Sequence, residues 1–134
     1  ADMTRTFFYK KVPSEKHRAI YETVRRANAA AEAILKPGVP LCEVDKAARQ
    51  IIEDAGYGPN FTHRLGHFIG LEVHEYGDVS SANTKVAEVG NIFSIEPGIY
   101  VEGEVGVRIE DLVLITEDGC EILNSFSKEL DIVE

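Results

Sequence analysis

The sequence predicts an α+β fold in which two helices precede a set of short strands and hairpins. Two observations support this class. Alanine-rich segments with apolar residues every three or four positions fill the first half of the chain, and after Gly58-Pro59 the pattern changes to short alternating segments divided by glycines. A chain of 134 residues with 44% hydrophobic and 28% charged residues suits one globular domain, so we expect residue 58 to separate two halves of one domain.

The first element expected is a short strand in the opening "ADMTRTFFY", where polar and apolar residues alternate. This strand begins without an entry loop, so we expect the natural chain to extend upstream of Ala1. An amphipathic helix follows over residues 14–35, with Ser14 as N-cap and with Pro37 and Gly38 ending it. Its apolar face comprises Ile20, Val24, Ala27, Ala31 and Ile34 with Leu35.

A second helix is predicted over residues 42–55, ended by Gly56, and both helices are interpreted as scaffold. The expected strands cover residues 71–75, 91–96, 99–102, 105–116 and 120–123, and the turn "EGEVG" joins the third to the fourth. Within 105–116, the two-residue period of a strand places Arg108 and Glu110 on one face and Val107, Ile109 and Asp111 on the other.

Charge and cysteine content narrow the class of protein. A net charge of −9 argues against nucleic acid as a partner, because phosphate binding rests on basic surfaces. We expect a soluble protein, since no apolar run reaches the roughly 18–20 residues that span a bilayer and no leader pattern opens the sequence. Cys42 and Cys120 lie far apart and form no CxxC pair, which favours free thiols and a cytoplasmic location.

Three of the four histidines lie in "HRLGHFIGLEVHE", as His63, His67 and His74. A single histidine is usually a satisfied polar residue in a loop, whereas three within twelve positions favour catalysis or metal binding. The motif is not the HExxH signature of zinc peptidases, because no glutamate follows the first histidine and Gly66 weakens a helix there. His17, on the polar side of the first helix, is expected to be exposed to solvent.

Carboxylates near these histidines are candidate oxygen donors for a metal. Glu96 follows an apolar run and is stopped by Pro-Gly, so the alternative is a charge at an exposed strand end. Glu110 lies in a strand rich enough in Val, Ile and Leu to be buried, where a carboxylate needs a partner or a metal. An ion pair with Arg108 is the competing interpretation. The full set of candidates is Asp2, Glu72, Glu75, Glu96, Glu110 and Asp111.

Four motifs taken in order resemble the pita-bread metallopeptidases, and most closely the Xaa-Pro dipeptidases (prolidases) and Xaa-Pro aminopeptidases. They are "DMTRTF", "HRLGHFIGLEVHE", "FSIEPGIYV" and "GVRIEDLVLITEDGCEIL". The resemblance implies a curved antiparallel sheet with two helices packed on it. It also implies that residues 1–134 are the C-terminal part of a catalytic domain whose N-terminal half is absent, and that one further aspartate ligand lies upstream of Asp2.

The same resemblance implies that Asp2, His67, Glu96 and Glu110 bind two divalent cations with a bridging water. Manganese is expected, with cobalt or zinc as alternatives, because oxygen-rich coordination suits a hard cation. Glu96 is then the general base that activates the water.

The resemblance gives the remaining candidate residues roles toward the substrate. His74 contacts the scissile peptide, while His63 and Arg108 help to bind substrate or move protons. The expected substrate is a peptide with proline at the second position, and the full-length protein is expected to be a homodimer.

The sequence departs from the family pattern at Phe68, where glycine is usual, so the phenyl ring is expected to alter the backbone or the substrate pocket. Three alternatives stay open. Retention of the ligand set argues against a metal-free creatinase-like hydrolase and against a non-catalytic pita-bread interaction module, while His63 and Arg108 argue against a methionine aminopeptidase.

Overall fold

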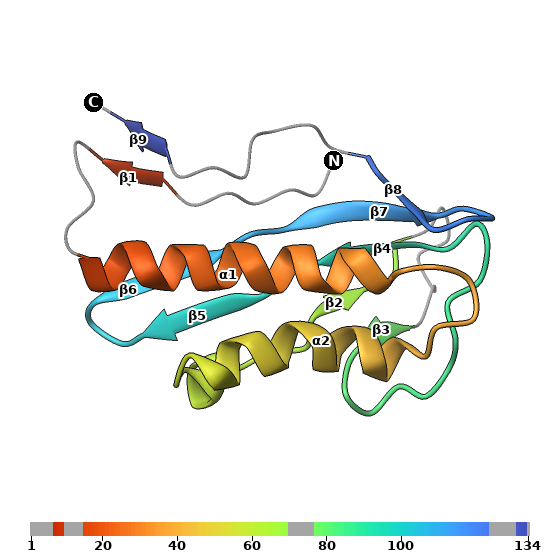
Figure 1. The fold of residues 1–134 in the computed structure, drawn as a ribbon, viewed down its shortest axis with the longest axis horizontal. Helices are drawn as coiled ribbons and strands as arrows, with labels where there is room; N and C mark the ends of the chain where they lie inside the picture. The colour runs from red at the N-terminus through yellow and green to blue at the C-terminus, as the bar shows by residue number, and fades with distance from the viewer. Residues whose placement is uncertain (1–6, 10–14, 70–76, 124–130, 134) are drawn as a thin grey trace.

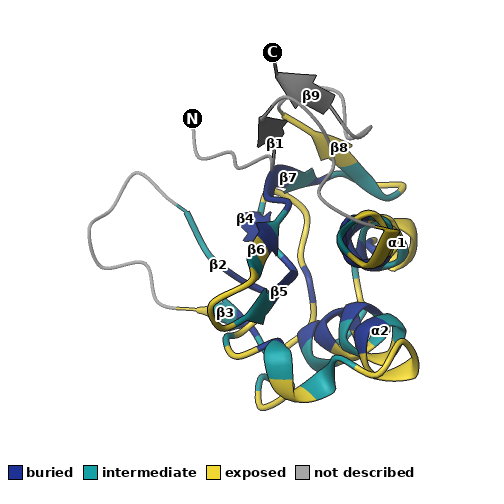
Figure 2. Ribbon diagram, turned by 90° about the vertical axis from the view of Figure 1, so that its left-hand side faces the viewer, coloured by how far each residue is buried: buried dark blue, intermediate teal, exposed yellow. Residues whose placement is uncertain are grey.

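The computed structural model describes residues 7–9, 15–69, 77–123 and 131–133. In this part of the chain two helices lie side by side and cover one side of the strands (Figures 1 and 2). Helix α1 spans Glu15–Ile34 and helix α2 spans Leu41–Asp54, followed by the short 3-10 helix η1 over Gly58–Asn60. Both long helices begin and end within one residue of the predicted bounds, while the Ser14 cap lies outside the described residues. The strands are β1 (Phe7–Tyr9), β2 (Gly66–His67), β3 (Asp78–Val79), β4 (Ile92–Ile95), β5 (Gly98–Val101), β6 (Val105–Arg108), β7 (Asp111–Ile115), β8 (Cys120–Ile122) and β9 (Asp131–Val133).

The core lies between the helices and the strands (Figure 2). Fully burying an aliphatic or aromatic side chain contributes about 1.5–3 kcal/mol, so the apolar faces read from the sequence are what bring these layers together. The Asn28 amide of α1 also donates a hydrogen bond of 3.4 Å to the Ile95 carbonyl of β4, which ties the helix to the central strand. Among the largest fully buried side chains are Tyr21, Ile20, Val24, Leu41, Ile52, Phe93, Ile95, Ile99 and Ile109.

A single antiparallel register runs through four of the strands. In the first half Ile95 pairs with Asp111, and in the second Gly98 pairs with Arg108. Both pairs belong to one alignment, so β4–β5 and β6–β7 form one long hairpin that is interrupted in the middle. Its turn contains Gly103 at φ 74°, a conformation that glycine adopts readily, as the predicted turn requires.

The prediction of one continuous strand over 105–116 is therefore wrong. The chain forms β6 and β7 with Ile109 and Glu110 between them, opposite the gap between β4 and β5. Pro97 explains the interruption, because it has no N–H to complete the ladder. It accepts a hydrogen bond of 3.3 Å from the Ile109 N–H but cannot return one.

Three of the remaining strands, β2, β3 and β8, extend this hairpin on its two sides. β8 pairs antiparallel with β7, β2 pairs antiparallel with β3, and Phe68 forms a bridge to Phe93 that joins β2 to β4. β1 and β9 form a separate parallel pair, which the sequence did not predict. The strand expected over 71–75 lies outside the described residues. Neither α1 nor α2, the two long helices among the described residues, has the length and hydropathy of a bilayer-spanning segment.

The interpretation of His17 as solvent-exposed is wrong. Its side chain is only 12% exposed, and Nε2 lies 3.0 Å from a carboxylate oxygen of Glu104 at the tip of the hairpin. The Lys16 ammonium donates to the other oxygen of the same carboxylate at 3.1 Å. The first turn of α1 is thus attached to the β5–β6 turn, a contact between residues 87 and 88 positions apart.

Candidate metal centre

The interrupted hairpin places two glutamates opposite each other. Continuing the register through the gap aligns Glu96 with Glu110, one position from the pair formed by Pro97 and Ile109. Pairs alternate along an antiparallel ladder between hydrogen-bonded and non-hydrogen-bonded types, and the side chains of the second type lie closer together. Because Ile109 donates to Pro97, the Glu96–Glu110 pair is of the second type, and the two carboxylates converge on one face.

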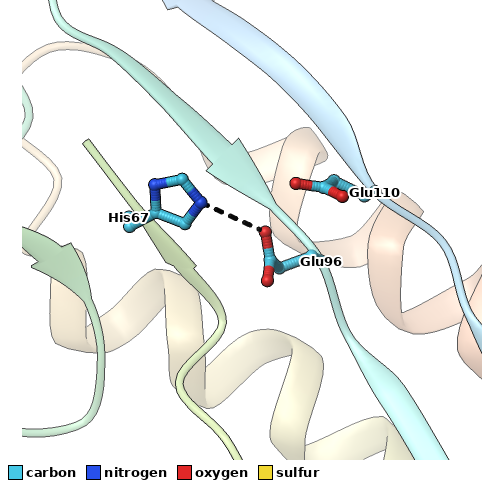
Figure 3. A group of neighbouring side chains, drawn as sticks. All are labelled: His67, Glu96 and Glu110. Atoms are coloured by element: carbon cyan, nitrogen blue, oxygen red, sulfur yellow. Dashed lines mark ion pairs between the residues drawn. The ribbon is translucent and has the colours of Figure 1, made fainter. Parts of the chain in front are cut away.

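His67 approaches this pair from β2 (Figure 3). The backbone N–H of His67 donates a hydrogen bond of 3.0 Å to Ser94 Oγ, which fixes β2 against β4. The contact is close because residue 66 is glycine: a Cβ at that position would lie 1.8 Å from the Ser94 carbonyl oxygen. Figure 3 shows the His67 ring directed at Glu96, with Nε2 3.7 Å from Glu96 Oε2.

His67, Glu96 and Glu110 together form a donor set that fits a divalent cation. One ligand atom from each lies within 4.8 Å of the others. Atoms bound to one cation at about 2.0–2.6 Å are separated by at most about 4–5 Å, so this spacing suits shared coordination. Two carboxylates and one imidazole are ligands that manganese, cobalt and zinc accept.

Burial supports the same interpretation. Glu110 is only 4% exposed, and the Glu96 side chain is 16% exposed. Glu96 Oε2 is buried and has no hydrogen-bond partner among the described residues. Two carboxylates facing each other, one buried and one largely covered, repel, and a cation between them would offset that cost. The exposed strand end considered for Glu96 is not what the structure shows.

His63 lies beside this group and contacts Tyr100. Its Nδ1 is 2.7 Å from the Arg64 carbonyl, which only accepts, so Nδ1 carries the proton. In the neutral ring Nε2 then accepts a hydrogen bond of 2.7 Å from the Tyr100 hydroxyl. Both nitrogens of the imidazole are therefore hydrogen-bonded, and Nε2 faces Tyr100 of β5.

Tyr100 connects His63 to Arg108 and to the two glutamates. The pKa of the Tyr100 phenol is raised above its ordinary value of 10.0, and burial is the largest cause; the positive charge and the hydrogen bond of Arg108 act in the opposite direction. The negative charges of Glu96 and Glu110 raise the pKa further. The phenol is thus a neutral hydrogen-bond donor at neutral pH.

The sequence reasoning missed Tyr100, although a signal was present. Glu96, Gly98 and Tyr100 alternate along one strand line and so share a face. A Cβ on Gly98 would lie 2.6 Å from the Tyr100 hydroxyl, so this glycine provides the space into which the phenol folds. The sequence signal for Tyr100 was therefore Gly98, which lies two residues before it and two residues after the candidate ligand Glu96.

The other predicted site residues have different outcomes. Asp2 and His74 lie outside the described residues, as do Glu72 and Glu75, so their roles stay predictions. Asp111 is fully buried and belongs to the opposite face of the hairpin from Glu110, as the two-residue period predicted.

Comparison with known proteins agrees with this chemistry. Residues 1–117 match Metallopeptidase family M24. An uncharacterized peptidase of Staphylococcus haemolyticus is 53% identical over 128 residues, which are 96% of this chain and 36% of that protein. An uncharacterized peptidase of Staphylococcus epidermidis is 51% identical over the same share of each chain. The chain thus spans little more than a third of the length of these relatives.

Solved structures are similar over almost the whole chain. An X-Pro aminopeptidase from Thermotoga maritima superposes with a TM-score of 0.92 at 41% identity, covering 99% of this chain and 38% of that one. The prolidase from Pyrococcus horikoshii gives 0.92 at 45%, covering 97% and 37%. The Xaa-Pro dipeptidase from Bacillus anthracis gives 0.94 at 39%, covering 99% and 37%. With two helices on antiparallel strands and a family match over most of its length, the chain is part of a pita-bread fold and belongs to metallopeptidase family M24.

Proposed function

We propose that the protein to which this chain belongs hydrolyses the peptide bond before proline, as an Xaa-Pro dipeptidase or aminopeptidase. The observation that carries the proposal is the convergence of His67, Glu96 and Glu110 within 4.8 Å. The names of the similar solved structures, which are X-Pro aminopeptidase, prolidase and Xaa-Pro dipeptidase, support proline as the specificity. The chain then represents the C-terminal part of the catalytic domain.

The proposed centre contains two divalent cations, with manganese as the expected metal. His67, Glu96 and Glu110 would hold them together with Asp2 and a further upstream aspartate. Bound divalent cations supply a water of lowered pKa and positive charge near the scissile carbonyl. Glu96, whose Oε2 has no hydrogen-bond partner among the described residues, is suited to accept the proton of that water.

Residues around the centre would bind and orient the substrate. His74 is proposed to donate a hydrogen bond to the carbonyl oxygen of the scissile bond, where negative charge develops during attack. His63, Tyr100 and Arg108 are proposed to contact the substrate beside the glutamates, and the neutral Tyr100 hydroxyl donates to the His63 ring at 2.7 Å. A proline nitrogen has no N–H to offer, so recognition must rest on shape and on such positioned groups.

The test uses the full-length protein loaded with manganese and a panel of Xaa-Pro dipeptides, Xaa-Pro tripeptides and Met-Xaa peptides. We expect cleavage of Xaa-Pro peptides and little cleavage of Met-Xaa peptides. Failure to cleave any Xaa-Pro peptide would refute the assignment, and preferential cleavage of Met-Xaa peptides would identify a methionine aminopeptidase instead.

Two histidine variants test the division of roles. His67→Ala should lose metal and activity together, because it removes a ligand, whereas His74→Ala should keep metal and lose turnover. His17→Ala is the matched control, since His17 contacts Glu104 at the far end of the hairpin. Equal loss of metal in His67→Ala and His74→Ala would contradict the division.

We also propose a homodimer in a reducing compartment such as the cytoplasm. Both cysteines, Cys42 and Cys120, are free thiols, which agrees with a reducing environment. Light scattering of the full-length protein tests the dimer, and a monomeric mass would overturn that part of the proposal.

A further inference from the structure

Helix α2 contains a partly buried ion pair, with the Arg49 side chain 25% exposed, that the metal centre does not include. Asp45 is fully buried, and Arg49, one turn later, donates to both of its carboxylate oxygens, from Nε at 2.9 Å and from Nη2 at 3.2 Å. A pair that buries its carboxylate is seldom more stable than apolar residues of similar volume, so stability alone does not account for it. The other hydrogen bonds of Asp45 and Arg49 suggest a further role for the pair.

Those contacts all reach the segment 61–65, which leads from η1 into β2. Arg49 Nη1 donates to the Phe61 carbonyl at 3.0 Å, and Nη2 donates to the His63 carbonyl at 3.0 Å. The guanidinium also lies 4.0 Å from the centre of the Phe61 ring. On the other side, Asp45 Oδ1 accepts a hydrogen bond of 3.2 Å from the Leu65 N–H. Two side chains thus fix three backbone groups within five residues.

The same segment faces the metal centre. The Leu65 carbonyl accepts a hydrogen bond of 2.7 Å from the Glu96 N–H. The His63 ring accepts from Tyr100 at 2.7 Å and packs edge-on against Phe61, with ring centres 5.2 Å apart. The backbone that Asp45 and Arg49 fix is therefore the backbone from which His63 is directed into the site.

We propose that Asp45 and Arg49 are positioning residues for the hydrolytic site, acting through the 61–65 backbone to hold His63 against Tyr100. Only arginine has the planar fork of donors that can bind one carboxylate in bidentate fashion and two carbonyls together. The proposal assumes the Xaa-Pro peptidase function for its kinetic test, while its spectroscopic test does not depend on any substrate.

The kinetic test is a double-mutant cycle in the manganese-loaded full-length protein, with Arg49→Lys and His63→Ala separately and combined. Arg49→Lys should lower kcat/KM for an Xaa-Pro peptide by about 10–100-fold, since small displacements of a substrate-positioning group have effects of this size. In the His63→Ala background the same change should cost less than about threefold, because its target is gone. Arg25→Lys is the matched control: Arg25 makes a partly exposed pair with Glu22 on α1 at 3.2 Å, away from the 61–65 segment.

The spectroscopic test follows the ring nitrogens of His63 in ¹⁵N-histidine-labelled full-length protein. Arg49→Lys should change the His63 nitrogen shifts, because the Tyr100 contact is lost, and should leave those of His17 unchanged. Asp45→Asn serves as the second variant if Arg49→Lys does not fold: it removes the charge but keeps an acceptor for Leu65, so a smaller change in the same direction is expected.

Each outcome decides the proposal. If Arg49→Lys lowers kcat/KM by the same factor with and without His63, or leaves the His63 shifts unchanged, the pair acts only in stability and the proposal is overturned. If the wild-type protein cleaves no Xaa-Pro peptide but the His63 shifts still respond to Arg49→Lys, the positioning role holds and the proposed function fails.

Discussion

Replacing Gly66 by alanine should damage the metal centre by pushing β2 away from β4. A Cβ at residue 66 would lie 1.8 Å from the Ser94 carbonyl oxygen and 2.7 Å from the Ser94 carbonyl carbon. Real Cβ contacts are essentially never shorter than 3.0 Å, so the two backbones must separate by at least 1.2 Å, the difference between 3.0 and 1.8 Å. Neither side yields easily, because Ser94 is fully buried and belongs to the central strand.

The displacement affects His67 directly, since it is the next residue and its N–H is hydrogen-bonded to Ser94 Oγ at 3.0 Å. Metal–ligand distances tolerate only about ±0.2 Å, so a shift of this size removes His67 from coordination. We expect manganese affinity to fall by at least about tenfold, as disturbing even an outer-shell partner costs about 10–100-fold. Overpacking should also lower stability by about 1–3 kcal/mol.

The assay is calorimetric titration of manganese into chelator-treated full-length protein, together with thermal melting in the presence of chelator. Gly119→Ala is the matched control, because a Cβ there would meet only the Leu35 carbonyl oxygen, at an ordinary 3.6 Å, and its φ is not positive. That variant should bind metal and melt like the wild type. A Gly66→Ala protein with unchanged affinity and melting temperature would refute the reasoning.

Three further predictions concern charges and pH. Glu110→Gln should weaken manganese binding at least about tenfold, since it removes a charged oxygen ligand from the donor set; unchanged manganese affinity would contradict this. Hydrogen bonds from Lys16 and then His17 hold the pKa of Glu104 below its ordinary value of 4.5. The ionised Glu104 carboxylate therefore stabilises the folded state above pH 4.5, and this contribution is lost as the pH falls through the lower pKa of the folded state. Glu104→Gln should therefore lower the melting temperature most at neutral pH, and a constant difference down to acid pH would argue against the contact. Burial raises the pKa of Tyr100 above 10.0, so the absorbance titration of wild type minus Tyr100→Phe should show a transition above pH 10.0, with stability falling as the pH rises through it; a transition at or below that pH would disprove the burial effect.

The two helices could be predicted from the sequence because their signals are local. Apolar residues at three- and four-residue spacing locate the buried face. Helix α1 ends at Ile34, shortly before Pro37, and Gly56, with φ of 90°, directly follows the Ala55 cap of α2. The same holds for the hairpin turn at Gly103. Each of these signals lies within a few residues of the element that it defines.

The candidate ligands could be predicted from the sequence, although their arrangement could not. The motifs around His67, Glu96 and Glu110 singled out these residues, and the structure brings all three together within 4.8 Å. What aligns the two glutamates is one register shared by both halves of the hairpin, interrupted at Pro97. Strand periodicity alone predicted an unbroken strand over 105–116. The missing N–H of Pro97 interrupts the strand that lies opposite it, and the sequence does not show which strand that is.

Contacts between segments that are distant in the sequence could not be predicted in the same way. The class of fold, the positions of the helices and the candidate metal ligands could all be predicted without the structure. Only the packed chain shows that Asp45 and Arg49 reach the 61–65 backbone, that Tyr100 folds over Gly98 to meet His63, and that His17 is attached to the hairpin tip. The physical reason is that periodicity records whether a side chain faces the core, whereas its hydrogen-bond partner depends on which other segment packs there.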